Sequence, residues 1–179
     1  MPLVLLQQCR RTWTAQDFVT LVIEPTVSHL SKIPFQIAAP QLMLGIALHE
    51  SGGLKHRRQI GGGPALGLFQ METRTHNDIW NNFLRYRTDL ADQVRALRAL
   101  DGSPRASEMI SDDIYAAAMC RVHIYRYSPN LPGRGEIKAQ AKIWKQHYNT
   151  VLGAGTIDKY VADWNTYGGP KVSFRNYCS

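Results

Sequence analysis

One carboxylate in the sequence stands where a proton donor could be built. Glu50 ends an apolar run over residues 42–50, and after Ser51 two glycines follow. We expect a helix that ends at Glu50, because the apolar residues recur at helical spacing and glycine commonly ends a helix. Burial and the negative end of the helix dipole would both raise the pKa of this carboxyl. A glutamate that keeps its proton near neutral pH can act as a general acid. The alternative is a solvated carboxylate at a helix end.

A second polar residue, Gln70, follows twenty residues after Glu50 in an otherwise apolar block. The segment between them contains Gly61-Gly62-Gly63-Pro64, which cannot lie inside a helix, so residues 51–71 predict a loop or a short irregular hairpin. The Gln70 amide could hold a substrate carbonyl or hydroxyl, or fix Glu50, while Phe69 and Met71 could wall the site. Core packing is the alternative for Phe69, and loop hydrogen bonding is the alternative for Gln70.

Helical patterns surround this segment on both sides. Thr14 is expected to begin one helix as its N-cap, and Pro25 should kink or stop it. Pro40 suits the first turn of the helix that ends at Glu50. Further helical patterns begin near Thr73, Leu90, Ser111, Ile137 and Thr156. The expected fold is therefore mostly α, a single helical domain over residues 1–179 with a small irregular or hairpin segment after Glu50.

Charge and cysteine content restrict the class of protein further. The sequence has 21 Lys and Arg against 14 Asp and Glu, a net charge of +7, so an anionic partner is expected: nucleic acid, a membrane surface or a cell-wall polymer. Residues 55–58 are the nearest approach to a basic patch. Cys9, Cys120 and Cys178 are odd in number and widely spaced, which predicts neither a disulfide framework nor a zinc site, and Cys120 is expected to be a buried thiol. No apolar run is long enough for a membrane span, and the apolar start lacks the basic region of an export signal.

Motifs of several other chemistries are absent from the sequence. There is no phosphate-binding loop, no dinucleotide fingerprint and no GxSxG nucleophile elbow. His49-Glu50 is followed by no second histidine at helical spacing, so the zinc-protease pattern fails, and we expect no metal and no cofactor. The basic residues lack the stripe or recognition motif of a nucleic-acid binder, so that class is only a distant third alternative.

Two ordered blocks resemble the soluble lytic transglycosylases of the lysozyme-like superfamily, which includes the goose-type lysozymes. Glu50-Ser51 matches the family's catalytic Glu followed by Ser at a helix end. The block 65–71, with Thr75 beyond it, resembles the family's Gly-Leu-Met-Gln block. The spacing here is slightly longer, Phe69 stands for the Met, and Glu72 stands where a Pro is usual.

The second block lies near the C-terminus. Residues 162–170 resemble the family's Ala-Tyr-Asn-Ala-Gly-Pro block, in which Asn165 matches and Trp164 replaces the Tyr. The final third, including residues 144–150 and 153–156, is similar to small lysozyme-like proteins of tailed phages. The resemblance implies an α+β lysozyme-like fold and Glu50 as the catalytic acid. It also implies a set of substrate-binding residues: Ser51, Gln70, Met71, Trp164, Asn165 and Tyr167.

A second catalytic carboxyl is missing from the usual place. Glycosidases commonly use two carboxyls, and no Asp or Glu lies between Glu50 and Gln70. A lone Glu fits the lytic transglycosylase route that the resemblance implies, in which the substrate's own groups complete the reaction and an anhydro-muramic sugar forms. Glu72 is the main candidate for a second acid, since it could activate water and make an inverting muramidase. Asp78 and Asp163 are weaker candidates.

The expected function is cleavage of the bond between N-acetylmuramic acid and N-acetylglucosamine in bacterial peptidoglycan. The protein would be a monomeric phage endolysin or a virion-carried lysin, acting as a lytic transglycosylase or a muramidase. It would be made in the host cytoplasm and reach the wall by holin-dependent release or within the virion. The alternative is a non-catalytic lysozyme-like protein that is part of the virion or binds the wall, although the retained Glu50 argues against it.

Overall fold

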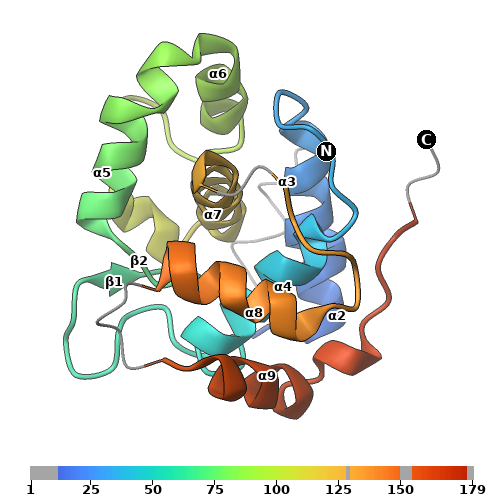
Figure 1. Cartoon of the computed structure of the whole chain (residues 1–179). Helices are drawn as coiled ribbons and strands as arrows, with labels where there is room; N and C mark the ends of the chain where they lie inside the picture. The colour runs from blue at the N-terminus through green and yellow to red at the C-terminus, as the bar shows by residue number, and fades with distance from the viewer. Residues whose placement is uncertain (1–11, 128–129, 150–154, 177–179) are drawn as a thin grey trace.

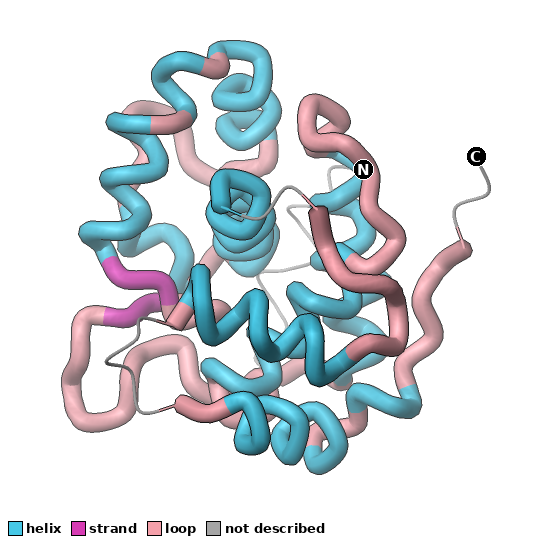
Figure 2. Tube along the Cα trace, in the orientation of Figure 1, coloured by secondary structure: helices cyan, strands magenta, loops and turns pink. Residues whose placement is uncertain are grey.

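A computed structural model describes residues 12–127, 130–149 and 155–176 of the chain. The described part is mostly helical and carries one small two-stranded sheet (Figures 1 and 2). Its centre is formed by two helices, α4 (Ala39–Glu50) and α7 (Asp113–Tyr127), and Figure 1 shows α7 almost end-on. Residues 39–48 of α4 and 113–124 of α7 are all buried. A helix that is buried on every side needs neighbours on every side, so the remaining helices enclose these two.

The N-terminal helical run has three parts: α2 (Ala15–Phe18), the π-helical turn η1 (Val19–Ile23) and α3 (Glu24–His29). Thr14 begins it as predicted, because its hydroxyl accepts a hydrogen bond from the Asp17 backbone N–H at 3.0 Å. Of the kink or stop expected at Pro25, the stop does not occur, since the run continues to His29. The turn widens before the proline, where the Glu24 N–H donates to the Val19 carbonyl. Pro25 then stands in the first turn of α3, where its missing N–H does little harm.

The helix that carries Glu50 begins and ends as the sequence predicts. Pro40 lies in the first turn of α4, and Glu50 is its last residue. Gly52 and Gly53 follow with φ of 62° and 80°, a left-handed conformation that glycine adopts without strain. The Gly53 N–H donates to the Leu48 carbonyl at 2.8 Å, which closes the helix end.

The segment after Glu50 is the loop and short hairpin that the glycines predicted. Strand β1 (Ala65–Leu66) pairs antiparallel with β2 (Met71–Glu72), with Ala65 opposite Glu72. β2 runs directly into α5 (Thr73–Asn82), so the hairpin and the first turn of α5 form one continuous wall.

The other elements lie in two groups on either side of the central helices (Figure 1). One group joins α5 and contains η2 (Leu84–Tyr86), α6 (Thr88–Ala96) and η3 (Ala106–Ile110). The other contains α8 (Ile137–Ile143), its π-helical continuation η4 (Trp144–Tyr148), α9 (Ile157–Thr166) and η5 (Gly169–Lys171). α9 packs on α4 and on α8, which brings the second group to the helix end that carries Glu50.

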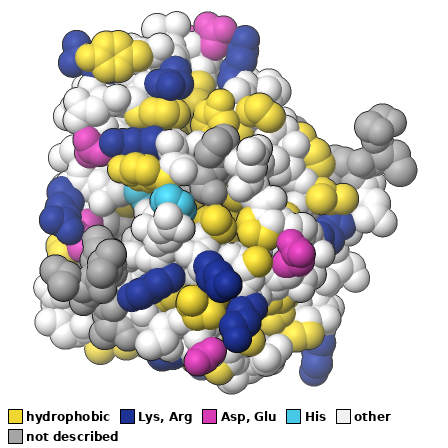
Figure 3. Space-filling model, in the orientation of Figure 1, with side chains coloured by type: hydrophobic (Ala, Val, Ile, Leu, Met, Phe, Trp, Pro, Cys, Tyr) yellow, Lys and Arg dark blue, Asp and Glu magenta, His cyan; other side chains and the backbone are white. Residues whose placement is uncertain are grey.

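The surface and the cysteines add three findings. On the face shown in Figure 3, the visible Lys and Arg side chains lie in separate places and form no continuous stripe.

Within residues 12–127, 130–149 and 155–176, none of the helices combines the length and apolarity needed to cross a bilayer. Cys120 is a buried free thiol, as predicted, whereas Cys9 and Cys178 lie outside the described residues.

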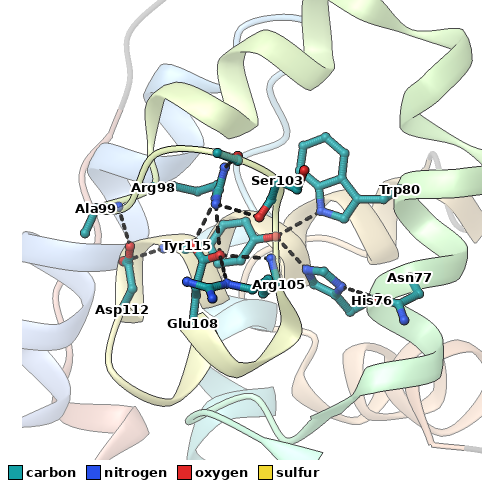
Figure 4. Close-up of polar contacts among 11 residues, drawn as sticks. His76, Asn77, Trp80, Arg98, Ala99, Ser103, Arg105, Glu108, Asp112 and Tyr115 are labelled. Atoms are coloured by element: carbon teal, nitrogen blue, oxygen red, sulfur yellow. Dashed lines mark hydrogen bonds and ion pairs between the residues drawn. The ribbon is translucent and has the colours of Figure 1, made fainter.

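A buried polar network joins α5, η3 and α7 (Figure 4). Arg98 donates to both carboxylate oxygens of Glu108, each at 2.9 Å, and to the Gly102 carbonyl at 2.7 Å. Beside this pair, Trp80 donates through Nε1 to the Tyr115 hydroxyl at 2.9 Å, and this hydroxyl lies 2.6 Å from Nε2 of His76. The network pins the connection between α6 and α7, where regular backbone pairing is lacking.

Candidate active site

Glu50 lies in a groove of about 680 Å³. The end of α4 and the loop after it form the floor, and the hairpin with the first turn of α5 forms one wall. Side chains from α7, η4 and the end of α9 complete the groove. Four of the residues predicted for the site line it together with Glu50: Gln70, Met71, Glu72 and Tyr167.

The Glu50 carboxyl has the electrostatic environment of a proton donor. Burial raises its pKa from 4.5 to about 7, and one side-chain hydrogen bond opposes this shift. That bond comes from the indole Nε1 of Trp144, which donates to Oε1 at 2.7 Å. Among the described residues, no cationic side chain contributes to the shift of this pKa. The carboxyl is therefore about half protonated near pH 7, which suits a group that first gives a proton and later takes one back.

Gln70 occupies the wall of the groove in an unusual backbone conformation. Its φ is 46°, in the left-handed region that few residues other than glycine adopt. Its Nε2 donates to the Gly67 carbonyl at 2.8 Å and to the His56 carbonyl at 3.3 Å. Gln70 thus ties the hairpin turn to the loop that follows Glu50, and lines the groove at the same time.

The hydrophobic residues beside Gln70 divide between core and groove. Phe69 is fully buried and packs against Phe18 at a ring-centroid distance of 5.9 Å, so it belongs to the core. Met71 is also buried but lines the groove. The Tyr148 hydroxyl donates to the Phe69 carbonyl at 2.7 Å, which joins η4 to the hairpin across the groove.

Three of the predicted substrate-binding residues, Ser51, Trp164 and Asn165, do not line the groove. Ser51 is fully buried; its hydroxyl donates to the Ala47 carbonyl at 2.6 Å and accepts from the Leu54 N–H at 2.9 Å. A hydroxyl at a helix end meets free carbonyls within its own turn, and here it closes that turn. Trp164 is buried against Gly169, whereas Asn165 is exposed on α9. The helical periodicity of α9 turns these two neighbours to different faces, and neither face lines the groove.

The candidate second acids differ in their placement. Glu72 lines the groove, and its carboxylate forms an ion pair with Arg74 Nε at 2.6 Å. Asp163 pairs with His49 at 2.7 Å behind the groove. Asp78 pairs with Arg126 at 2.5 Å and lines only the neighbouring hollow. Glu72 is therefore the one of the three that shares a groove with Glu50.

A smaller hollow of about 470 Å³ extends the groove. Both cavities are lined by Arg74, Thr75, His123 and Tyr148. His123 is buried between them; its Nε2 bonds to the His147 carbonyl at 3.0 Å, and burial lowers its pKa to about 4. The ring is therefore neutral near pH 7 and carries its proton on Nε2.

Sequence reasoning missed Trp144, the residue that bonds to Glu50. A tryptophan on an apolar helical face is most simply interpreted as core, and Trp144 is indeed fully buried. Only the partner of its indole N–H marks it as part of the site, and that partner lies 94 residues away in the chain. His49 and His123 were also missed, because only the tertiary structure brings their side chains to the groove.

Comparisons of the chain with protein-family models, curated proteins and solved structures gave no significant match.

Proposed function

We propose that this protein cleaves the glycosidic bond between N-acetylmuramic acid and N-acetylglucosamine in bacterial peptidoglycan, with Glu50 as the general acid. The observation that carries the proposal is a largely buried carboxyl with a pKa of about 7 that opens into a groove. The order and spacing of Glu50, Gln70 and Asn165 resemble those of a peptidoglycan-cleaving family, and this resemblance is the basis for peptidoglycan as the proposed substrate. A basic protein also suits an anionic wall polymer.

The reaction begins with protonated Glu50. Its O–H gives the proton to the glycosidic oxygen as the bond from that oxygen to the muramic sugar breaks, and positive charge develops on the sugar. Glu50 is then a carboxylate, which the Trp144 N–H stabilises. An O–H group next attacks the sugar and loses its proton to a carboxylate, which restores a neutral product.

The attacking group can come from two sources. If it is a hydroxyl of the muramic sugar itself, Glu50 alone takes the proton and an anhydro product forms. If it is water, Glu72 is placed in the same groove to take the proton, and a reducing end forms. In either case the proposed role is that of a phage lysin, which rests on the resemblance of residues 144–150 and 153–156 to small lysozyme-like proteins of tailed phages.

The first test is the release of soluble muropeptides from purified peptidoglycan by the parent and by Glu50→Gln. Removal of a general acid should reduce the rate by about 100-fold or more. Glu136→Gln is the matched control, because Glu136 is exposed and lies outside the groove. Equal rates for the parent and Glu50→Gln would refute the role of Glu50. Retention of the parent on peptidoglycan without any release would indicate a wall-binding protein instead.

The second test is mass spectrometry of the released fragments. Anhydro and reducing ends differ in mass by one water, so the spectrum of the parent's products identifies the attacking group. With water as the attacker, Glu72→Gln should lower the rate by about 100-fold, as for other general bases. With the internal hydroxyl as the attacker, the products are anhydro and Glu72→Gln keeps most of the rate.

A further inference from the structure

The carboxyl of Glu50 accepts a hydrogen bond from Trp144, and other side chains enclose Trp144 in turn. Trp144 is fully buried, and its Nε1 donates to Glu50 Oε1 at 2.7 Å. We infer that Trp144 is a positioning residue for Glu50 and that the His49–Asp163 pair fixes the indole for this task. The role in catalysis rests on the proposed function, whereas the contact itself can be tested without substrate.

The packing around the indole leaves it no room to turn. The His49 ring meets it edge-on, with a centroid distance of 4.4 Å and an interplanar angle of 75°. Tyr160 of α9 covers it at 5.4 Å. A Cβ atom on Gly155 would lie 2.6 Å from the indole Cη2, so only glycine fits there. The direction of the N–H is therefore set by α9 and by Gly155, two residues before it, as well as by the helix that carries Trp144.

The His49 ring is fixed in turn by an acid from α9. Nδ1 of His49 lies 2.7 Å from Asp163 Oδ2, and the same oxygen accepts from Lys159 Nζ at 2.8 Å. Burial lowers the pKa of His49, so near pH 7 its ring is neutral and the Nδ1 proton points at Asp163. Asp163, His49, Trp144 and Glu50 thus form a line of contacts that connects α9 to the helix end at the groove.

The line of contacts has a chemical consequence for Glu50. The indole bond engages Oε1, which leaves Oε2 to carry the proton that is donated. After the transfer, the same N–H stabilises the carboxylate. Without the indole, the carboxyl would hold its proton more tightly and would lose its fixed orientation.

Other titratable groups surround Glu50 and bear on any test by pH. Cys120, Tyr148 and Tyr160 interact electrostatically with Glu50, and removal from water raises the pKa of each. They therefore stay neutral over the range in which Glu50 titrates. The other titratable or charged residues that line the groove with Glu50 are His49, Lys55, His56, Glu72, Arg74, His123 and Tyr167.

The experiment is a carboxyl ¹³C NMR titration of Glu50 in the full chain, with the signal assigned by its loss in Glu50→Gln. Trp144→Phe should raise the pKa of Glu50 by about one unit, because one hydrogen bond to the charged form is lost. Trp80→Phe is the matched control. It also removes an indole hydrogen bond, the one to Tyr115 Oη at 2.9 Å, but outside the groove, and should leave the pKa of Glu50 unchanged.

A second measurement needs no change at Trp144. In the unmodified protein, the chemical shift of the Trp144 indole N–H proton should change with pH at the same midpoint as the Glu50 carboxyl. The chemical shift of the Trp80 indole N–H proton should not change over this range. Glu50→Gln should abolish the shift. A Trp144 indole signal that ignores the titration of Glu50 would overturn the inference, as would an unchanged pKa in Trp144→Phe.

Activity assays separate the positioning role from a merely structural one. Asp163→Ala should lower kcat for peptidoglycan about tenfold with little change in KM, and Asp163→Asn should restore most of the rate, because the amide oxygen still accepts from His49. The same loss in Ala and Asn would contradict the role of Asp163. If the parent releases no muropeptides while the NMR shifts appear as stated, the proposed function fails and the positioning contact stands.

Discussion

Glu50 and Glu108 are two glutamates that the fold removes from bulk solvent, and they are satisfied in opposite ways. Glu108 accepts three hydrogen bonds, two from the Arg98 guanidinium and one from the Arg105 backbone N–H, each at 2.9 Å. Glu50 has one side-chain donor, Trp144, and an open groove on its other side. Figure 4 shows the first arrangement, in which the donors point at the carboxylate of Glu108.

The difference between the two sites lies in what a buried carboxylate requires. A charged group in a protein interior needs donors and a counter-charge, and Glu108 has both. Glu50 lacks the counter-charge, so burial favours its neutral form and its pKa rises to about 7. The fully bonded Glu108 carboxylate fixes a loop between helices, whereas the Glu50 carboxyl, with one donor and no counter-charge, has a proton available for transfer. Four measurements test this contrast.

The largest change in stability is expected from Glu108→Gln. The substitution leaves Arg98, whose side chain is 3% exposed, as a buried cation without its partner. The free energy of unfolding should fall by about 3–5 kcal/mol. Urea denaturation at pH 7 measures the loss. A loss below 1 kcal/mol would show that the network in Figure 4 contributes little, and the contrast between the two glutamates would fail.

Glu50→Gln should raise the free energy of unfolding rather than lower it, and the size of this gain should depend on pH. The pKa is about 7 in the folded protein against 4.5 for an unperturbed carboxyl. Stability from the protonated form is fully present below pH 4.5 and is lost as the pH rises through 7. At pH 8 the variant should therefore be more stable than the parent by about 3 kcal/mol, with no such gain at pH 4.5. Denaturation curves at the two pH values decide this, and a gain that does not change with pH would contradict it.

Gly67→Ala tests whether the two regions are mechanically joined. Gly67 has a φ of 72°, and a Cβ there would clash with the carbonyl oxygen of Met109, the residue after Glu108. Gly102→Ala is the matched control, because its φ is 83° and no atom lies near the new Cβ. Both variants incur backbone strain, but Gly67→Ala should lose about 2 kcal/mol more from the clash. It should also slow cleavage, since the hairpin carries Gln70. Equal losses of stability in calorimetry would show that the hairpin and η3 move apart freely.

The smallest effect is expected at Ser51. Its hydroxyl closes the turn after α4 and does not line the groove. Ser51→Ala should lower the free energy of unfolding by about 1 kcal/mol and leave the rate on peptidoglycan unchanged. A large loss of rate with intact stability would restore Ser51 to the substrate-binding set.

Local patterns predicted the position of the candidate acid well. The helix end at Glu50, the hairpin after it, the N-cap at Thr14 and the burial of Cys120 are all confirmed. Each depends on residues within a few positions of one another, because glycine, proline and capping side chains act on the backbone next to them. Pro25 does not stop its helical run, because a π-helical turn, which no local pattern announces, precedes it.

The tertiary structure decided which side chains meet at Glu50. Two tryptophans, Trp144 and Trp164, look alike as apolar residues at helical spacing, and the second was favoured because the block 162–170 resembles a family block in which it replaces a Tyr. The fold instead turns Trp144 towards Glu50 and buries Trp164 against Gly169. Periodicity predicts that a face is buried but not against what, since that depends on how helices distant in sequence pack. The sequence by itself therefore placed a carboxyl at the end of an apolar helix. Only the packing of the hairpin, α5, α7, η4 and α9 around that end gave the carboxyl its single donor, its groove and its raised pKa.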